Sequence, residues 1–197
     1  MPKVLILFAH PRLENSRINQ SMVGKIPASP MITFVDLYEK YPDFNVNIEE
    51  EKKLLEAHDI IIWHHPLYWY SAPPLLKQWI DMVLELGWAY GPGGTALSGK
   101  WIFNAITTGG TKEAYSREGH NRFYLNEFLA MFNQTAHLCK MIYLPPFVLQ
   151  GTHRLSDAQN ARGAQAYCEI LEGLIDGRWE LETLIKLNNL NELIEIK

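Results

Sequence analysis

The sequence predicts an α/β fold, a doubly wound sheet of five parallel strands flanked by helices. Short, continuous apolar runs recur along the chain, and such runs are typical of strands that are covered on both faces. Segments of helical character separate the runs, and this alternation favours a parallel sheet. With 197 residues, 47% of them hydrophobic and 20% charged, the chain is long enough for one domain with a sizeable core.

Each predicted element follows from a local pattern. The strands are the apolar runs Lys3–Phe8, Ile32–Val35, Asp59–Trp63, Trp101–Ile106 and Met141–Leu144. The helices are the segments between and after them: Ser16–Lys25, Ile48–Ala57, Leu75–Leu86, Glu127–Leu138 and Ser156–Ile175. The last helix is expected to take Ser156 as its N-cap, because a serine hydroxyl accepts a hydrogen bond from the first helical turn.

The predicted domain covers residues 1–177, and residues 178–197 form a tail. Leucine and isoleucine recur in this tail at roughly helical spacing, which predicts an added amphipathic helix. The pattern leaves open whether the helix packs on its own domain or on a partner.

Bulk composition argues against several functions. A net charge of −4 gives no basic face for nucleic acid. Cys139 and Cys168 lack metal-ligand spacing and favour a reducing compartment. No signal sequence or membrane-spanning run is recognisable, so we expect a cytoplasmic protein. No metal site is expected either, because the adjacent His64 and His65 on a strand point to opposite faces.

Three loops at the carboxyl ends of predicted strands carry unusual residues: His10–Asn19, Pro66–Ala72 and Thr107–His120. Ligands of doubly wound sheets bind at this edge. In the first loop there is no G-x-G-x-x-G fingerprint, but Ser16 and Asn19 at a helix start could cradle a phosphate, with charge from Arg12 and Arg17. The alternative is that Ser16 is only an N-cap.

The second and third loops differ in chemistry. Tyr68, Trp69 and Tyr70 offer aromatic faces to a flat ligand, although a dimer interface or a core cluster would also use them. In the third loop, Thr107 and Thr108 offer hydroxyl groups, and the Gly109–Gly110 pair permits close approach of the backbone to a ligand.

Several of these stretches, taken together and in order, resemble one family. They are Ala9–Pro11 (AHP), His65–Trp79 (HPLYWYSAPPLLKQW), Gly87–Lys100 (GWAYGPGGTALSGK) and Thr107–Gly110 (TTGG). They resemble the flavodoxin-like NAD(P)H:quinone oxidoreductases, in the branch of bacterial general-stress enzymes and potassium-efflux antiporter ancillary proteins. Tyr41–Glu51 and Leu144–Phe147 are similar to that branch as well, and the resemblance covers residues 1 to about 175.

The resemblance implies a flavodoxin-like fold and a bound FMN, with FAD the less favoured cofactor. It implies two-electron, ping-pong hydride transfer from NAD(P)H through flavin N5 to a quinone. The residues expected to bind the cofactor are His10, Ser16, Arg17, Ile18, Asn19, Leu67, Tyr68, Trp69, Tyr70, Thr107, Thr108, Gly109 and Gly110. Tyr115 and His120 are the expected catalytic pair, although their spacing departs by one residue from the mammalian pattern.

The resemblance also implies a homodimer with active sites at the interface, where Trp88 and Tyr90 would reach the partner's substrate pocket. The alternative function is a regulatory ancillary subunit of a glutathione-gated potassium-efflux antiporter. Such a subunit would keep its flavin site and lie against the inner face of the cell membrane. The preference for NADH or NADPH and the physiological acceptor stay open.

Overall fold

One parallel sheet lies at the centre of the computed structural model, which describes residues 1–194. Its strands are β1 (Val4–Phe8), β2 (Ile32–Asp36), β3 (Ile60–Pro66), β4 (Trp101–Thr107), β5 (Ile142–Tyr143) and β6 (Phe147–Leu149). The strand order is β2-β1-β3-β4-β5, with β6 also on β4, and every pairing is parallel. The predicted α/β fold is therefore confirmed.

The strands β5 and β6 are two halves of one edge strand. The first half pairs Ile142 with Trp101 at the start of β4, and the second pairs Phe147 with Ala105 near its end. Between the halves lie Pro145 and Pro146, which have no backbone N–H to donate to the ladder. The predicted strand over Met141–Leu144 thus covers only the first half.

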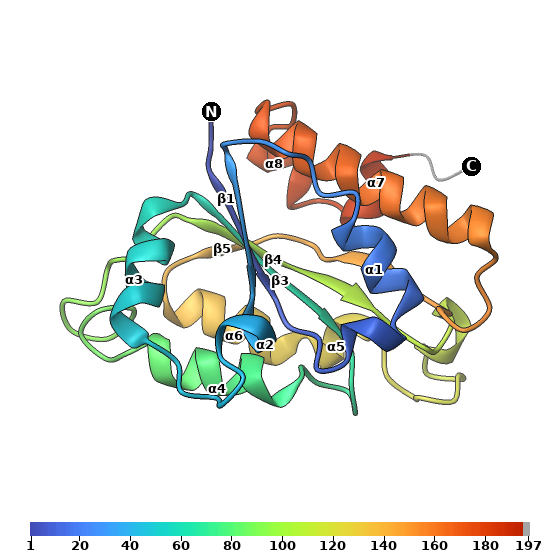
Figure 1. Ribbon diagram of the computed structural model, residues 1–197, viewed down its shortest axis with the longest axis horizontal. Coiled ribbons are helices and arrows are strands. Elements are labelled where there is room, and N and C mark those ends of the chain that lie inside the picture. The colour runs from blue at the N-terminus through green and yellow to red at the C-terminus, as the bar shows by residue number, and fades with distance from the viewer. Residues whose placement is uncertain (195–197) are drawn as a thin grey trace.

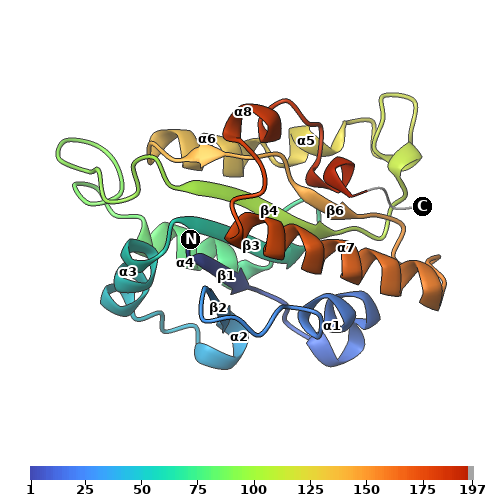
Figure 2. The same cartoon turned by 90° about the horizontal axis from the view of Figure 1, so that it is seen from above.

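Helices cover both faces of the sheet (Figures 1 and 2). One face is covered by α1 (Arg17–Val23) and α7 (Asp157–Ile175). The other face is covered by α3 (Ile48–Ala57), α4 (Pro74–Val83) and α6 (Ala130–Leu138). The short helices α2 (Leu37–Lys40) and α5 (Leu125–Phe128) lie beside these three. The hydroxyl of Ser156 accepts the N–H of Gln159 at 3.3 Å, so the predicted N-cap of α7 is confirmed. No helix within residues 1–194 combines the length and the apolar composition that a membrane crossing needs.

The tail after Gly177 differs from the single helix expected. It forms the short helix α8 (Leu181–Leu184) and a 3₁₀ turn at Leu190–Leu193, and its residues 195–197 lie outside the described part. Asn188 and Asn189 separate the two pieces, and asparagine favours turns because its side chain competes for backbone hydrogen bonds. The tail packs on its own domain and returns toward β6 (Figure 2).

Candidate cofactor site

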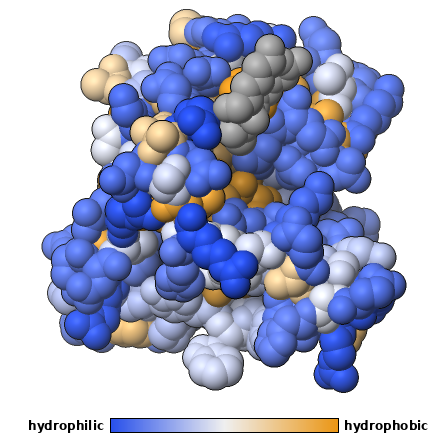
Figure 3. Space-filling view, turned by 90° about the vertical axis from the view of Figure 1, so that its right-hand side faces the viewer, coloured by the Kyte–Doolittle hydropathy of each residue, from blue (hydrophilic) through white to orange (hydrophobic). Residues whose placement is uncertain are grey.

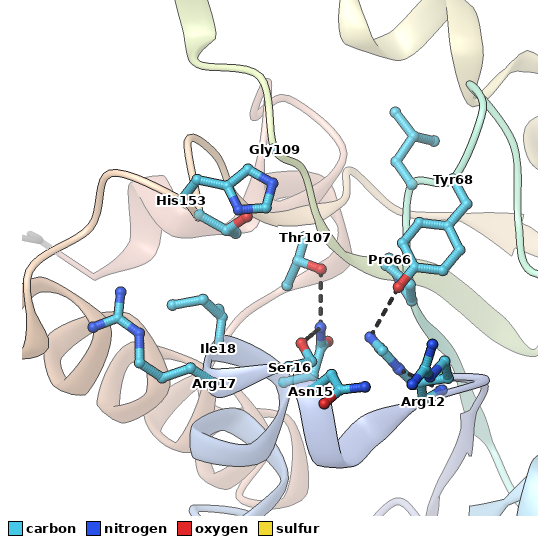
Figure 4. Close-up of a pocket in the computed structure, with 14 residues that line it drawn as sticks. Arg12, Asn15, Ser16, Arg17, Ile18, Pro66, Tyr68, Thr107, Gly109 and His153 are labelled. Carbon is cyan, nitrogen blue, oxygen red and sulfur yellow. Dashed lines mark hydrogen bonds between the residues drawn. The ribbon is translucent and has the colours of Figure 1, made fainter.

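A pocket of about 680 Å³ opens at the carboxyl ends of β1, β3 and β4 (Figure 4). Its lining is His10, Arg12, Asn15, Ser16, Arg17, Ile18, Asn19, Pro66, Leu67, Tyr68, Thr107, Gly109, Thr152 and His153. Figure 3 looks onto this side of the molecule, where apolar surface is exposed between two hydrophilic lobes. The structure therefore brings together nine of the thirteen residues predicted to bind a cofactor.

His10 is held as a neutral imidazole at the floor of the pocket. Its Nδ1 accepts the backbone N–H of Arg12 at 3.1 Å, so the ring proton is on Nε2, which lies 3.3 Å from the Tyr68 hydroxyl and donates to it. Burial lowers the pKa of His10, opposed by the charge of Glu14. The hydroxyl proton of Tyr68 is consequently free to serve a ligand in the pocket.

Ser16 precedes α1, but its side chain makes no capping hydrogen bond to the helix among the described residues. The Oγ atom instead accepts from Asn19 Nδ2 at 2.8 Å, and the same amide group donates to Thr107 Oγ1 at 3.1 Å. The Asn19 side chain thereby connects α1 to the end of β4 (Figure 4). Its Oδ1 atom is buried and has no donor within residues 1–194. The reading of Ser16 as only an N-cap is therefore disfavoured.

Two arginine side chains, Arg12 and Arg17, line the pocket, and within the described part of the chain no acidic side chain does. Arg12 Nε lies 3.6 Å from a carboxylate oxygen of Glu14, which is outside the lining. Arg17 lies about half exposed and bonds to Asp157 and to the carbonyl of Leu155, which links the start of α1 to the start of α7. Two guanidinium groups beside polar hydroxyl and amide groups favour an anionic ligand, such as a phosphate.

The aromatic loop Tyr68–Ser71 is a tight and strained turn. Tyr68 and Ser71 exchange backbone hydrogen bonds at 3.0 and 2.9 Å, and between them Trp69 (φ 48°) and Tyr70 (φ 66°) adopt left-handed conformations. Bulky residues rarely accept such angles, and strain of this kind is typical of functional sites. The side chain of Trp69 is 93% exposed, so the loop is not a core cluster. Only its first residue, Tyr68, lines the pocket.

A buried hydrogen-bonded chain supports the base of this loop. His65 Nδ1 donates to the carbonyl of Pro66 at 2.9 Å, and its Nε2 accepts from Asn104 Nδ2 at 2.9 Å. The Oδ1 atom of Asn104 then accepts the hydroxyl proton of Tyr143 at 2.5 Å. Since each group has a partner, the chain fixes the tautomer of His65 and the position of the Pro66 carbonyl.

The neighbouring His64 faces the other side of the sheet, as strand alternation predicts. It lies edge-on to the rings of Phe8 and Tyr167, and neither of its nitrogens has a partner among the described residues. His65 instead packs against Phe132 on the opposite face. Within residues 1–194, no three histidine, cysteine or acidic side chains gather as metal ligands would.

The glycine loop Thr107–Gly110 is held by its backbone. The carbonyl of Thr107 accepts the N–H of Leu67 at 2.8 Å, and the Thr108 hydroxyl donates to the carbonyl of Gly110 at 2.7 Å. A Cβ atom on Gly109 would lie 3.0 Å from His153 Nε2, which is tighter than ordinary contact. Thr107 and Gly109 line the pocket, whereas Thr108 and Gly110 shape the loop behind it.

Tyr115 packs directly behind the glycine loop. Its Cε2 atom would lie 3.0 Å from a Cβ on Gly110, and its ring meets Phe128 edge-on. Burial raises the pKa of Tyr115, and contact with Thr108 opposes that shift. The side chain lines a second pocket of about 730 Å³, which shares no lining residue with the first. His120 is exposed and lies outside the lining of both pockets.

Trp88 and Tyr90 lie far from this pocket. They belong to the loop between α4 and β4, at the left of Figure 1, whereas the pocket is at the carboxyl ends of the strands on the right. Trp88 Nε1 donates to Glu56 at 2.9 Å, and the Lys52 ammonium lies over its ring. These two aromatic residues can therefore reach a pocket of this kind only in another copy of the chain.

Thr152 and His153 line the pocket but were not predicted from the sequence. They follow β6, whose pairing with β4 brings Thr152 N–H to the carbonyl of Thr108 at 3.1 Å. The available signal was the apolar stretch Phe147–Leu149 with Gly151 behind it, which marks another strand end at the ligand-binding edge.

Comparison with known proteins identifies relatives along most of the chain. A family model described as flavodoxin-like fold matches residues 2–172. An uncharacterized NAD(P)H oxidoreductase of Bacillus subtilis, YdeQ, is 44% identical over 165 residues, 84% of each chain. The glutathione-regulated potassium-efflux system ancillary protein KefG of Erwinia tasmaniensis is 41% identical over 87% of this chain and 93% of its own.

Solved structures with the same fold are similar too. General stress protein 14 of Treponema denticola, in complex with FMN, is 36% identical, with a TM-score of 0.83 over 88% of this chain and 99% of that one. An NADPH-quinone reductase of P. pentosaceus is 32% identical, with a TM-score of 0.76 over 86% of this chain and 97% of that one. A protein described as a thermophilic tryptophan halogenase is 43% identical, with a TM-score of 0.81 over 84% and 96%. The fold is thus shared by proteins described with different activities.

Proposed function

This chain belongs to the flavodoxin-like fold family, and from that membership we propose that it is an FMN-dependent NAD(P)H:quinone oxidoreductase. The observation that carries the proposal is the pocket at the switch point of the sheet, which is lined by two arginines and by hydroxyl and amide groups. That pocket occurs in a chain 36% identical to a protein solved with FMN and 32% identical to an NADPH-quinone reductase.

The residues of the pocket fit FMN. Asn19 Oδ1 is a buried acceptor that lacks a donor among the described residues, and the ribityl hydroxyl groups of FMN are donors. Arg12 and Arg17 are suited to its phosphate, and the glycine loop admits the edge of a flat ring system at Gly109. Leu67 and Tyr68 supply an apolar and aromatic wall for that ring.

When bound, FMN supplies two-electron transfer, accepting from NAD(P)H and donating to a quinone in separate, ping-pong steps. The protein positions the ring and stabilises negative charge. Tyr115 keeps its proton at neutral pH, as tyrosines ordinarily do, and burial raises its pKa further, so its hydroxyl can donate a hydrogen bond beside Thr108. Backbone donors of the glycine loop are already fixed in place and need no reorganisation during the reaction.

A homodimer completes the proposal. Trp88 and Tyr90 lie too far from their own chain's pocket to contact it, and the 93% exposed Trp69 offers apolar surface beside that pocket. A partner chain placing its Trp88 near the aromatic loop would use both surfaces. Sedimentation at micromolar concentration should report about twice the 22.7 kDa of the chain, and a fully active monomer would refute the shared site.

The test of the function uses the purified protein. Heat or acid should release a flavin that chromatography identifies as FMN, one per chain, and the holoprotein should reduce a soluble quinone with NADH or NADPH. Recovery of FAD would correct the cofactor. Failure to bind any flavin, even after reconstitution, would overturn the proposal.

A second candidate function rests on the 41% identity to an ancillary protein of a potassium-efflux system. In that role the chain would dock on an antiporter at the cytoplasmic face of the membrane and regulate it, with its flavin site kept. Co-purification with such an antiporter, together with quinone turnover that depends on it, would favour regulation. Full turnover without the antiporter would favour the independent enzyme.

A further inference from the structure

Within residues 178–194, one side chain of the tail, that of Asn191, makes hydrogen bonds to the sheet. Its Oδ1 accepts the N–H of Val148 at 2.9 Å, and its Nδ2 donates to the carbonyl of the same residue at 2.9 Å. One residue earlier, the N–H of Leu190 donates to the carbonyl of Pro146 at 2.9 Å. The side-chain amide thus does for Val148 what a neighbouring strand would do, on the side of β6 that faces away from β4.

The other side of β6 reaches the glycine loop. Leu149 pairs in register with Thr107, and its carbonyl accepts the N–H of Thr108 at 2.9 Å. Directly after β6, Gly151 N–H donates to the carbonyl of Gly110 at 2.9 Å. A third backbone hydrogen bond runs from the N–H of Thr152 to the carbonyl of Thr108. Together the three bonds hold the glycine loop against β6 and the residues that follow it.

The strand β6 is paired with β4 on one side and has no strand partner on its outer side within the described residues. It contains three residues, and Pro145 and Pro146 interrupt its continuation from β5. Without Asn191, the N–H and carbonyl of Val148 would lose their partners on the outer side of this short edge strand. The tail itself is well anchored, since Leu184 and Leu190 are fully buried.

We propose that Asn191 is a positioning residue for the cofactor site: by clamping β6 at Val148, it holds the glycine loop Thr107–Gly110 in the geometry that binds FMN. The inference rests on the proposed function. It also assigns a task to a segment that lies beyond residues 2–172, the part matched by the family model. Asn191 touches no cofactor atom in this account and acts only through β6.

The experiment compares two substitutions of Asn191 with the same substitutions of Asn188. Asn191→Leu removes both hydrogen bonds to Val148. Asn191→Asp keeps a side-chain oxygen that accepts the Val148 N–H, but it has no N–H group to donate to the Val148 carbonyl. Asn188 is the matched control, because its side chain donates to Glu192 Oε1 at 3.1 Å, within the tail, and makes no hydrogen bond to the sheet among the described residues. Three quantities are measured at pH 7.5 and 10 °C: the Kd for FMN, the absorbance bands of bound FMN, and the amide exchange rate of Thr108.

Removing two hydrogen bonds to a half-buried residue should raise the Kd of Asn191→Leu about tenfold. Asn191→Asp should show a smaller rise, and the Asn188 variants should match the wild type. In Asn191→Leu the flavin bands should shift and the Thr108 amide should exchange faster. A merely structural role would leave the flavin bands unchanged and would speed exchange of amides throughout the sheet as much as that of Thr108, in protein that circular dichroism shows to be folded.

The outcomes separate the two proposals. A wild type that binds no flavin overturns the proposed function. A wild type that binds FMN, with Asn191→Leu matching it in Kd, bands and Thr108 exchange, overturns the role of Asn191 alone. If Asn191→Leu does not fold, the same measurements on Asn191→Asp test the positioning role. If Asn191→Asp does not fold either, Asn191 serves global stability and its positioning role is overturned.

Discussion

The two loops at the pocket reach rigidity by opposite means. In the aromatic loop, bulky residues occupy left-handed backbone conformations, and the carbonyl at its base is fixed by the buried His65. In the glycine loop, side chains are absent where Gly109 and Gly110 meet His153 and Tyr115, and backbone hydrogen bonds to β6 hold the segment. One loop is strained and rests on a buried histidine; the other has no left-handed residue and is held by backbone hydrogen bonds.

This difference separates two tasks. Strain at Trp69 presents a large apolar side chain to the surroundings, as contact with a partner chain or a flat substrate requires. Fixed backbone donors in the glycine loop suit a cofactor that stays bound, because they cost no reorganisation. The two supports should also respond differently to acid, to substitution and to relief of strain.

Acid should produce the largest effect, on the side of the aromatic loop. Burial lowers the pKa of His64 to about 3 and that of His65 to about 4, whereas β4, below the glycine loop, carries no ionisable side chain. Because the folded pKa values lie below the ordinary one, the unfolded chain binds more protons. Stability is then complete above about pH 6.5 and falls as the pH drops toward 4. The loss should be on the order of 5 kcal/mol by pH 4.5.

Urea unfolding at a series of pH values measures this loss of the free energy of unfolding. His64→Phe should remove about half of the loss. The protection of the Ser71 amide, measured as its exchange rate relative to the intrinsic rate at each pH, should also fall at a higher pH than that of the Thr108 amide. A parallel fall in the protection of both amides would show that the two loops share one support. A free energy of unfolding that stays flat between pH 6.5 and 4.5 would contradict the buried-histidine account.

The next largest effect is expected on flavin reduction. If the Tyr115 hydroxyl donates to charge on the flavin, Tyr115→Phe should raise the activation free energy of flavin reduction by NAD(P)H by roughly 1.5–3 kcal/mol. The reduction should then be about 10- to 150-fold slower, while FMN stays bound. Stopped-flow absorbance measures this step. Tyr124→Phe is the control, since Tyr124 lines the same second pocket but is about half exposed. A rate within about twofold of wild type would leave Tyr115 with a packing role only.

Gly109→Ala should weaken FMN binding by roughly 1–3 kcal/mol, or 5- to 150-fold, because the added methyl group stands at a position that lines the pocket. Its position, 3.0 Å from His153 Nε2, suggests a paired test. The double variant with His153→Ala removes that contact and leaves the new Cβ facing the pocket. We expect the double variant to stay weak in FMN titrations. Recovery to wild-type affinity would show that the glycine serves the His153 contact and not the cofactor.

Sequence patterns located most of this architecture. The apolar runs mark all five strand positions, and the helix predicted over Ile48–Ala57 is the observed α3. Burial on both faces makes such strands uniformly apolar, so local composition is enough to find them. His10, Ser16–Asn19 and Thr107 followed from strand ends that were recognised correctly.

What was missed depends on long-range pairing. Pro145 and Pro146 look like the end of the last strand, so the pairing of β6 with β4, and with it His153, was not foreseen. The tail shows apolar periodicity, but it does not form one helix, since Asn188 and Asn189 interrupt it. Leu184 is buried from α8, and Leu190 is buried from the 3₁₀ turn that follows. Neither outcome can be read locally, because each depends on residues far along the chain.

The smallest effect concerns strain. Replacing Trp69 with glycine should stabilise the flavin-free protein by about 0.5–1 kcal/mol, because relief of a left-handed conformation exceeds the added entropy of the unfolded glycine. Urea unfolding of the flavin-free form measures it. Tyr68→Gly is the comparison, since Tyr68 has no positive φ to relieve and should only lose stability. Destabilisation by Trp69→Gly would mean that the exposed indole makes favourable contacts within the loop.

The pocket is assembled from both ends of the chain, with His10 on one wall and His153 on another. Ribosomes make the N-terminal part first, at about 5–20 residues per second, so roughly 7–30 s separate the synthesis of these two residues. During that interval β1 can already lie in the growing sheet, yet the cavity lacks a wall. Flavin loading therefore has to wait until β6 and His153 have been made, and a chain truncated before β6 would lack one wall of the site.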